Sequence, residues 1–250
     1  MSCEFCKSGC EPCCPHLQSY GFDRDGTFQE YVVVRGVDAA RIAPATDMAQ
    51  AAPILCGGVT VYKALKEAKL QAGQIVAVTG AGGGLGSLAI QYAKAMGLRV
   101  FAIDHDNKKE HCLELGAEWF LDGFQDGQKI VKDVREITNG GPHGVVSLAV
   151  AKAPMEQAME YIRKNGTVVY VGLPKDSKVT FDTAPFIFNA NKIVGSIVGN
   201  RLDVDEALEF VSRGVVKVPL ELIKLEDVER IYREMLDGTI KSRAVIDFSL

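Results

Sequence analysis

A glycine-rich turn between two apolar runs holds the residue types best suited to chemistry in this 250-residue chain. The first run, Val76–Thr79, ends in Gly80-Ala-Gly-Gly-Gly-Leu-Gly86, and the second, Phe101–Ile103, ends in Asp104. Glycines let the backbone approach a pyrophosphate closely, and the start of a following helix offers N–H groups and a positive dipole end. The acid can accept hydrogen bonds from a ribose and repels the extra phosphate of NADP. The pattern therefore predicts a dinucleotide site that favours NAD.

The glycine pattern has a second interpretation. The strict G-x-G-x-x-G motif is not met, because Ala81 stands at its first position before Gly83 and Gly86. A tight strand–helix connection without a ligand would also need glycines. The apolar runs on both sides, the helical spacing after the turn and an acid 18 residues beyond Gly86 favour dinucleotide binding.

Cysteines gather at the N-terminal end of the chain. Five of the seven lie within the first fourteen residues, at positions Cys3, Cys6, Cys10, Cys13 and Cys14. A secreted, disulfide-linked protein would spread its cysteines along the chain, so this cluster indicates a metal site in a reducing compartment.

The overall composition excludes several classes of partner. The net charge is −4 and no basic run stands out, which argues against nucleic acid and anionic membranes. The longest apolar stretches have the length of a strand, and the first residues lack the basic and apolar regions of a signal peptide. We therefore expect a cytoplasmic protein.

Apolar runs and helical patterns alternate from residue 74 onward. This alternation predicts a doubly wound parallel α/β sheet of six strands, in the order 3-2-1-4-5-6. The expected strands are 75–79, 99–104, 119–121, 144–149, 167–172 and 192–197, with helices near 85–96, 107–115, 126–138 and 154–164.

The segments outside this alternation predict further elements. Residues 26–35 are rich in β-branched side chains and predict a strand. Asp47 can cap a short helix that reaches Ala52, and a longer helix is expected over 58–68. Residues 215–223 read as an exposed strand edge. Further helices near 203–213 and 225–237 and a strand over 244–248 complete the prediction.

Several longer segments carry a resemblance to a known family. The most distinctive are Ala52–Leu65, Gly82–Gly97, Gly195–Arg201, and Cys3-Glu-Phe-Cys6 with Cys14-Pro-His16. With these segments the chain resembles the zinc-dependent medium-chain alcohol dehydrogenases, most closely the fungal, yeast-like branch. The resemblance covers the whole chain but only about the last two-thirds to three-quarters of a family member. It implies a catalytic-domain remnant over 1–57, a Rossmann-type NAD domain over 58–220 and a returning segment over 221–250.

The resemblance also implies a reaction. Family members transfer a hydride between an alcohol and NAD, with the alcohol or aldehyde bound at a catalytic zinc held by Cys, His and a second Cys. Cys56 matches the second Cys, and Thr60 is expected near the nicotinamide ring. The other ligands belong to a Gly-His-Glu-containing part that this sequence does not include. We therefore expect a truncated and impaired enzyme.

A structural zinc is implied as well. The family binds it with four cysteines in the spacing C-x₂-C-x₂-C-x₇-C, and Cys3, Cys6 and Cys14 match the last three. Cys10 or Cys13 could supply a replacement fourth thiolate. The alternative is a frayed N-terminus without metal.

By the same resemblance, the residues that bind NAD can be assigned one by one. The backbone of Gly83, Gly84 and Leu85 is expected to hold the pyrophosphate, and Arg243 to reach a phosphate. The remaining expected contacts are Asp104 and Lys108 at the adenosine ribose, Ala149, Val171 and Leu173 beside the nicotinamide, and Ser196 and Val198 at its carboxamide.

Family members form dimers or tetramers, so the resemblance implies self-association. We also expect uncovered apolar surface around Ile54, Leu55 and Val59. Two other functions stay open: a zinc-independent, quinone-reductase-like oxidoreductase, and a non-catalytic protein that binds NAD or promotes oligomers. Zinc content distinguishes the quinone-reductase-like enzyme from the dehydrogenase. Turnover of ethanol distinguishes the non-catalytic protein from the dehydrogenase.

Overall fold

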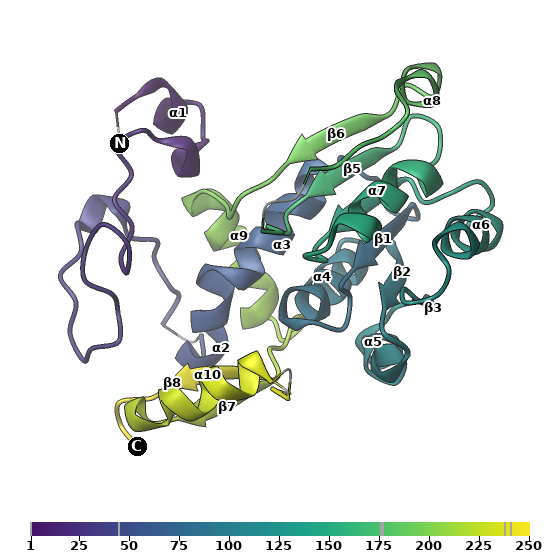
Figure 1. The fold of residues 1–250 in the computed structure, drawn as a ribbon. Helices are drawn as coiled ribbons and strands as arrows, with labels where there is room; N and C mark the ends of the chain where they lie inside the picture. The colour runs from purple at the N-terminus through teal and green to yellow at the C-terminus, as the bar shows by residue number, and fades with distance from the viewer. Residues whose placement is uncertain (1, 45, 176–177, 238, 241) are drawn as a thin grey trace. The chain divides into compact units, whose positions relative to one another are not determined.

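The computed structural model describes residues 2–44, 46–175, 178–237, 239–240 and 242–250, and divides the chain into two compact units. The first unit combines Met1–Val59 with Gly199–Leu250, and the second is Thr60–Val198 (Figure 1). The predicted domain limits at residues 57 and 220 stay a prediction, because compact units are defined by packing alone. In the described part of the chain, no helix has the length and apolar character needed to cross a membrane.

The second unit is built on a six-stranded parallel sheet in the predicted order, β3-β2-β1-β4-β5-β6. The doubly wound fold is therefore confirmed. Its strands are β1 (Ile75–Thr79), β2 (Arg99–Asp104), β3 (Trp119–Asp122), β4 (Gly144–Ser147), β5 (Thr167–Tyr170) and β6 (Lys192–Gly195). Its helices are the greater part of α3 (Gly57–Glu67), then α4 (Gly84–Ala95), η4 (Asp106–Lys108), α5 (Lys109–Leu115), α6 (Gly127–Ile137), α7 (Lys152–Tyr161) and α8 (Thr183–Phe188).

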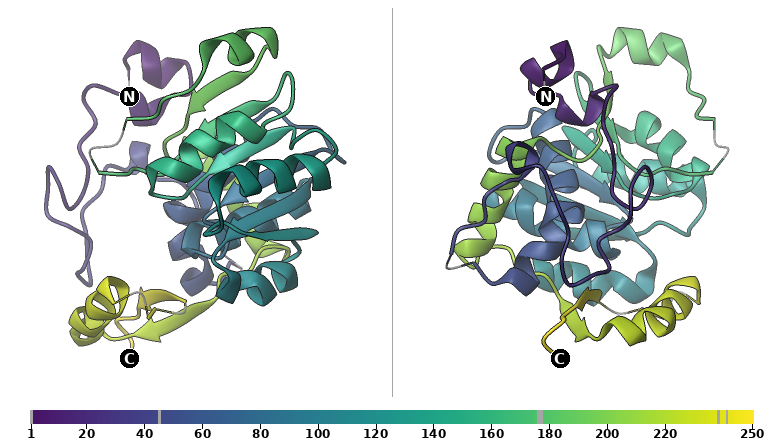
Figure 2. Two further views of the ribbon diagram at one scale, coloured as in Figure 1. Left: turned by 45° about the vertical axis from the view of Figure 1, so that its right-hand side comes forward. Right: turned by 90° about the vertical axis from the view of Figure 1, so that its left-hand side faces the viewer.

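Helices cover the sheet because its central strands are apolar on both faces. Every residue of β1 and β4 is buried. Phe101 and Val145 project from the sheet into one core with Ile130 of α6 and Tyr161 of α7. Figure 2 shows the teal helices α6 and α7 along that face of the sheet. At the edge of the sheet β6 is largely exposed, since it has a neighbouring strand on one side only.

The first unit consists mostly of short elements and loops. Its elements are α1 (Glu4–Lys7), η1 (Glu11–Cys13), η2 (Gly36–Asp38), α2 (Met48–Ala51), η3 (Ala52–Leu55), α9 (Arg201–Ser212), β7 (Leu220–Ile223), η5 (Leu225–Asp227), α10 (Val228–Leu236) and β8 (Arg243–Ile246). Asp47 caps α2 as predicted, by accepting a hydrogen bond from Ala49 N–H at 2.9 Å. Strands β7 and β8 pair in parallel and form a separate two-stranded sheet.

The predicted strand over residues 26–35 is wrong. The structure has no strand there, and the side chains of Tyr31 and Val33 are 87% and 92% exposed. β-branched residues favour an extended backbone, but an extended segment becomes a strand only when another strand takes its hydrogen bonds. No described segment pairs with this one.

Two predictions about exposed apolar surface also need correction. Val216 and Val218 are buried, and the strand in this region is β7, which pairs with β8. The predicted exposure of Val216 and Val218 is therefore wrong, whereas β7, with β8 as its one neighbour among the described strands, is still an edge strand. Ile54 and Val59 are buried as well, so of the three residues expected in an uncovered patch only Leu55 is exposed.

Candidate dinucleotide site and cysteine cluster

The turn after β1 has one position, Gly86, where the backbone packs so closely that only glycine fits. Gly80 has a φ of +69°, and Gly83 forms the N-cap of α4. A Cβ at Gly86 would overlap the carbonyl oxygens of Gly80 and Ala81, which fixes the close packing of the helix start on the turn. Gly83, Gly84 and Leu85 therefore lie at the N-terminus of a twelve-residue helix, where N–H groups favour an anion. Gly83 N–H also donates to Gly80 O within the turn, at 3.2 Å.

Asp104, the last residue of β2, holds this turn beside the end of its strand through hydrogen bonds. Its Oδ2 accepts a hydrogen bond from Gly82 N–H at 2.7 Å, and its Oδ1 accepts one from His105 N–H at 2.7 Å. The side chain of Lys108 lies over Gly82, where a Cβ would collide with it. The structure thus brings Asp104 and Lys108 to one turn. Gly82 is not among the residues predicted to bind the dinucleotide, although it begins the run of three glycines.

The residues expected beside the nicotinamide follow β4 and β5. Thr79 Oγ1 accepts hydrogen bonds from Leu148 N–H at 3.2 Å and Ala149 N–H at 3.3 Å. Val171 N–H donates to Ser147 O at 3.1 Å. These bonds hold Ala149 and Val171 at the carboxyl ends of neighbouring strands, the usual ligand edge of such a sheet. Leu173 follows with its side chain 87% exposed.

Ser196 and Val198 follow the edge strand β6. Ser196 N–H donates to Tyr170 O at 3.0 Å, so this group is already used within the sheet. Ser196 Oγ, in contrast, is buried and has no hydrogen-bond partner in the structure. Val198 has a φ of +35°, a strained conformation for a β-branched residue. An unpaired buried hydroxyl and local strain are features of ligand sites.

Arg243 and Cys56 belong to the first unit. Arg243 Nε is also buried without a hydrogen-bond partner. Burial lowers the pKa of this guanidinium, and the nearby Cys56 opposes the shift. Cys56 itself is exposed, and Thr60 lies on α3 with its side chain buried.

Within the second unit, the glycine turn and the unpaired Ser196 hydroxyl fit a dinucleotide, whereas the residues around Cys56 do not fit a catalytic zinc. Among the described residues, the one group of three or more metal-ligating side chains is Cys3, Cys6 and Cys14. Cys56 is not part of any such group, and a catalytic zinc needs three protein ligands.

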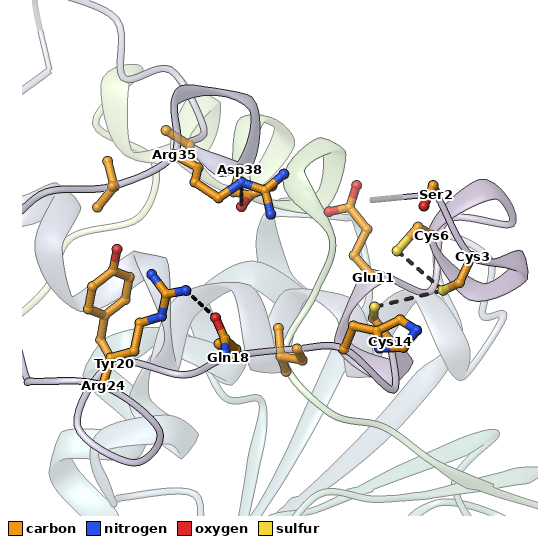
Figure 3. Close-up of a pocket in the computed structure, with 14 residues that line it drawn as sticks. Ser2, Cys3, Cys6, Glu11, Cys14, Gln18, Tyr20, Arg24, Arg35 and Asp38 are labelled. Atoms are coloured by element: carbon orange, nitrogen blue, oxygen red, sulfur yellow. Dashed lines mark hydrogen bonds and ion pairs between the residues drawn. The ribbon is translucent and has the colours of Figure 1, made fainter.

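The three N-terminal cysteines do fit a zinc ion. Cys3 Sγ lies 3.5 Å from Cys6 Sγ and 3.7 Å from Cys14 Sγ (Figure 3). Four sulfurs at about 2.3 Å from a tetrahedral zinc would be about 3.8 Å apart, so these distances are close to those of a site. Desolvation raises the pKa of Cys6 to about 11, and the hydrogen bond from the Cys6 backbone lowers the pKa of Cys3. The cluster borders a cavity of about 620 Å³.

Cys10 and Cys13 do not join this cluster. The structure links them to each other in a disulfide. In this form neither can donate a thiolate to a metal, so the fourth ligand proposed from the sequence is not provided by either residue.

Comparison with known proteins identifies the family. The zinc-binding dehydrogenase family matches residues 84–213. Two curated relatives from Caenorhabditis elegans, alcohol dehydrogenase 1 and alcohol dehydrogenase 2, are 69% and 59% identical over all 250 residues, which correspond to 71% of each relative.

Solved structures agree with this identification. The alcohol dehydrogenase of Aeropyrum pernix is 27% identical with a TM-score of 0.88, over 98% of this chain and 72% of that one. Acetophenone reductase from Geotrichum candidum, solved in complex with NAD, is 28% identical with a TM-score of 0.85, over 99% of this chain and 71% of that one. The chain therefore belongs to the zinc-type medium-chain alcohol dehydrogenase family.

Proposed function

We propose that this chain binds NAD in preference to NADP. We propose further that it belongs to an alcohol dehydrogenase polypeptide that interconverts alcohols and aldehydes or ketones. The observation that carries the proposal is the 2.7 Å hydrogen bond from Gly82 N–H to the Asp104 carboxylate. It fixes a negative charge beside the phosphate turn, at the place where the adenosine 2′-position lies in proteins with this unit. A phosphate at that position would meet the carboxylate, whereas a hydroxyl can donate a hydrogen bond to it.

The other residues have roles that follow from their positions. The N–H groups at Gly83, Gly84 and Leu85 bind the pyrophosphate, and Lys108 adds a cation beside the ribose. Ala149, Val171 and Leu173 border the nicotinamide. At the carboxamide, Ser196 contributes its unpaired hydroxyl rather than the backbone N–H, and Val198 contributes its backbone. Arg243 has an unpaired Nε with which to bind a phosphate oxygen. NAD, when bound, accepts the hydride from the alcohol carbon.

A titration of NADH and NADPH fluorescence tests the proposal. We expect the protein to bind NADH at least about tenfold more tightly, which corresponds to ~1.4 kcal/mol. Asp104→Asn removes the charge and should reduce the difference in affinity between NADH and NADPH. Asp106→Asn removes a neighbouring exposed charge and should leave that difference in affinity unchanged. Equal affinity of the unmodified protein for both nucleotides would contradict the proposal.

Cys56 is the one residue of this sequence that matches a ligand of the catalytic zinc. The 250-residue polypeptide is therefore expected to bind NADH without oxidising ethanol at a measurable rate. Thr60 would lie near the nicotinamide without completing a metal site. Robust ethanol oxidation by purified, zinc-supplied protein would show that other residues provide the ligands.

Cys3, Cys6 and Cys14 are proposed to bind a structural zinc. We expect about one zinc per chain, with these three thiolates at three of the four positions of a tetrahedral site. The metal content should fall to background in the Cys3→Ser, Cys6→Ser double variant and remain in Cys112→Ala, which alters a buried cysteine of the second unit. A protein that is free of zinc after expression in zinc-replete medium would support the frayed N-terminus instead.

Self-association as a dimer or tetramer is proposed through the edge strand β6. This strand has one neighbour, β5, and the side chain of Ile193 is partly exposed on it. Unpaired backbone groups along such an edge favour pairing with a second copy. Sedimentation should show at least a dimer that Ile193→Lys weakens, and a monomer at micromolar concentration would contradict this. A cytoplasmic location is proposed from the cysteine usage.

A further inference from the structure

The turn between Gly9 and Cys14 carries two cysteines that the zinc cluster does not use. The sequence Cys10-Glu-Pro-Cys13 has C-x₂-C spacing, and Cys13 N–H donates to Cys10 O at 2.9 Å. The two Cα atoms are 5.5 Å apart and the sulfurs are bonded to each other. The thiols of Cys3, Cys6 and Cys14 form a separate group. The loop therefore separates its five cysteines into a cluster of three and a pair.

We propose that Cys10 and Cys13 are a redox-active dithiol, a modification site that is oxidised by low-molecular-weight disulfides while the three-cysteine cluster keeps its zinc. The second half of this proposal rests on the proposed zinc site. The first half depends on the pair alone.

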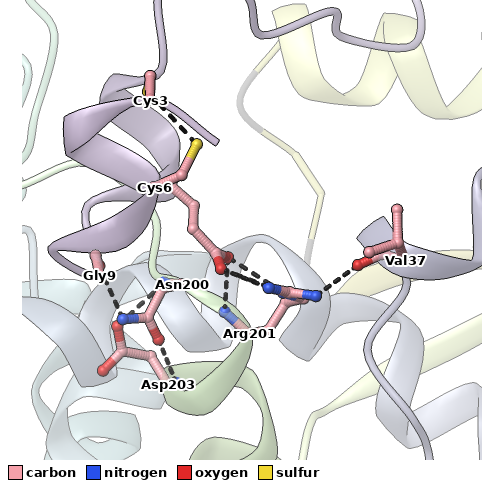
Figure 4. A network of polar contacts seen from close by, with 8 residues as sticks. Cys3, Cys6, Gly9, Val37, Asn200, Arg201 and Asp203 are labelled. Carbon is pink, nitrogen blue, oxygen red and sulfur yellow. Dashed lines mark hydrogen bonds and ion pairs between the residues drawn. The ribbon is translucent and has the colours of Figure 1, made fainter. Parts of the chain in front are cut away.

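The pair is held in place by contacts to α9 that do not involve the cluster. Arg201 Nη2 donates to Glu11 Oε1 at 2.8 Å, and Arg201 N–H donates to Glu11 Oε2 at 3.2 Å (Figure 4). Asn200 Nδ2 donates to Gly9 O at 2.8 Å, and Asn200 is itself fixed by a capping box with Asp203. The hydrogen bond and charge of Glu11 raise the pKa of Arg201, as expected for a guanidinium paired with a carboxylate.

This anchoring has a chemical consequence. Glu11 lies between the two cysteines and Gly9 directly precedes the first, so the turn is tied to α9 on both sides of Cys10. A turn held in this way keeps each thiol at a high effective concentration toward the other. Closure of the pair is then favoured over oxidation of either thiol with a separate molecule.

Exposure sets the order of the reaction steps. Cys13 is exposed and Cys10 is half-buried, so the Cys13 sulfur attacks one sulfur of a small disulfide RSSR first. The S–S bond of RSSR breaks, and one RS⁻ leaves and takes up a proton as RSH. The Cys10 sulfur then attacks the Cys13 sulfur and displaces the second RS⁻, which leaves as RSH. Two electrons pass from the pair to RSSR, and both thiol protons end on the two RSH molecules.

Glutathione provides the test. Zinc-supplied full chain is equilibrated with mixtures of reduced and oxidised glutathione, alkylated and mapped by mass spectrometry, while a chromogenic chelator reports released zinc. We expect a single disulfide, Cys10–Cys13, with the cluster thiols alkylated only after denaturation and zinc retained. The Cys10→Ser, Cys13→Ser double variant should form no disulfide and should retain its zinc as the unmodified protein does, because the pair and the cluster react separately.

Several outcomes would overturn the proposal. Zinc released in proportion to Cys10–Cys13 closure would make one of the pair a metal ligand. A disulfide between the pair and the cluster, or a pair that stays reduced at high oxidised glutathione, would also contradict it. If the chain carries no zinc but still closes Cys10–Cys13, the proposed zinc site fails and the dithiol assignment is supported.

A matched pair of charge variants tests the anchor. Glu11→Gln keeps the shape of the side chain but removes its charge, and should lower the disulfide-to-dithiol ratio at fixed glutathione by about threefold. Glu4→Gln removes an exposed charge from the same loop and should leave the ratio unchanged. Equal ratios in both variants would show that the contact with α9 does not hold the pair.

Discussion

The two compact units are stabilised in different ways. In the second unit, residues 60–198, the central strands bury every side chain, and Phe101 is fully buried. In the first unit, residues 1–59 and 199–250, large apolar side chains such as Phe22 lie 92% exposed on a long loop. The same residue type therefore supports a core in one unit and little packing in the other.

Polar side chains replace apolar packing at several places in the first unit. Gln50 pairs with the buried backbone of Val218 in both directions: Val218 N–H donates to Oε1 at 2.7 Å, and Nε2 donates to Val218 O at 3.1 Å. Arg201 and Glu11 connect the cysteine loop to α9. Hydrogen bonds of this kind contribute about 1 kcal/mol each, less than burial of a large side chain. We therefore expect the first unit to be the less stable.

The largest expected effect on stability comes from replacing one buried and one exposed aromatic side chain with alanine. Phe101→Ala should destabilise the second unit by about 4 kcal/mol, because it removes a buried ring and leaves a cavity. Phe22→Ala should change stability by less than about 0.5 kcal/mol, as expected for an exposed position. Urea unfolding followed by Trp119, the single tryptophan of the chain and part of β3 of the second unit, measures the first variant. Urea unfolding followed by far-UV circular dichroism, which reports both units, measures the second. A large effect of Phe22→Ala would show that its loop is packed.

A glycine substitution tests whether the phosphate turn shares the rigidity of the sheet. Gly86→Ala places a methyl group against the Gly80 and Ala81 carbonyl oxygens, and should cost about 3 kcal/mol, the upper range for overpacking. NADH affinity should fall in the same variant.

Gly195→Ala is the matched control, because no described residue other than its chain neighbours comes within 4 Å of the Cβ it would add. The two variants differ in the space around the new methyl group. If Gly86→Ala is as stable as Gly195→Ala, the helix start can move away from the turn, and the turn is not rigid.

The sequence allowed an accurate prediction of the second unit for a physical reason. A parallel sheet covered on both faces needs continuous apolar runs, and helices between them are recognisable by their 3.6-residue spacing. The strand order β3-β2-β1-β4-β5-β6 followed from this alternation. Strand ends were less accurate: β4 was predicted to reach Ala149 but ends at Ser147.

Prediction failed where structure depends on a partner rather than on local pattern. Residues 26–35 have the composition of a strand, yet no described strand pairs with them. Val216 and Val218 read as an exposed edge, but their burial depends on contacts that the local sequence does not encode. The unpaired Ser196 hydroxyl and the Cys10–Cys13 bond are likewise consequences of three-dimensional placement.

A deletion of the Gln50 side chain tests the polar contacts of the first unit. Gln50→Ala leaves the buried N–H and carbonyl of Val218 without these partners and should cost about 2 kcal/mol. Gln29→Ala removes an exposed hydrogen bond to Gly26 O and should have a negligible effect. Hydrogen exchange at the Val218 amide should accelerate about thirtyfold in the first variant only. Unchanged exchange would mean that apolar packing holds this segment.

The smallest expected effect is a dependence of the free energy of unfolding on pH that is confined to the second unit. The His143 ring faces two donors: Ile75 N–H lies 3.1 Å from Nδ1, and the Arg163 guanidinium lies 2.6 Å from Nε2. Protonation would remove the acceptor and place a second positive charge beside Arg163. Burial and this guanidinium therefore lower the pKa of His143 below its ordinary 6.5.

Below pH 6.5 the unfolded chain consequently binds more protons at His143 than the folded chain does. The free energy of unfolding should decrease as the pH falls from about 6.5 toward the lowered pKa, and should be constant with respect to this group above about 6.5. Because the ring is only partly buried, the loss should stay below about 1 kcal/mol. Urea unfolding of Trp119 between pH 5 and 7.5 should show this slope in the unmodified protein and in His105→Asn, but not in His143→Asn. A slope that persists in His143→Asn would assign the pH dependence to another titrating group.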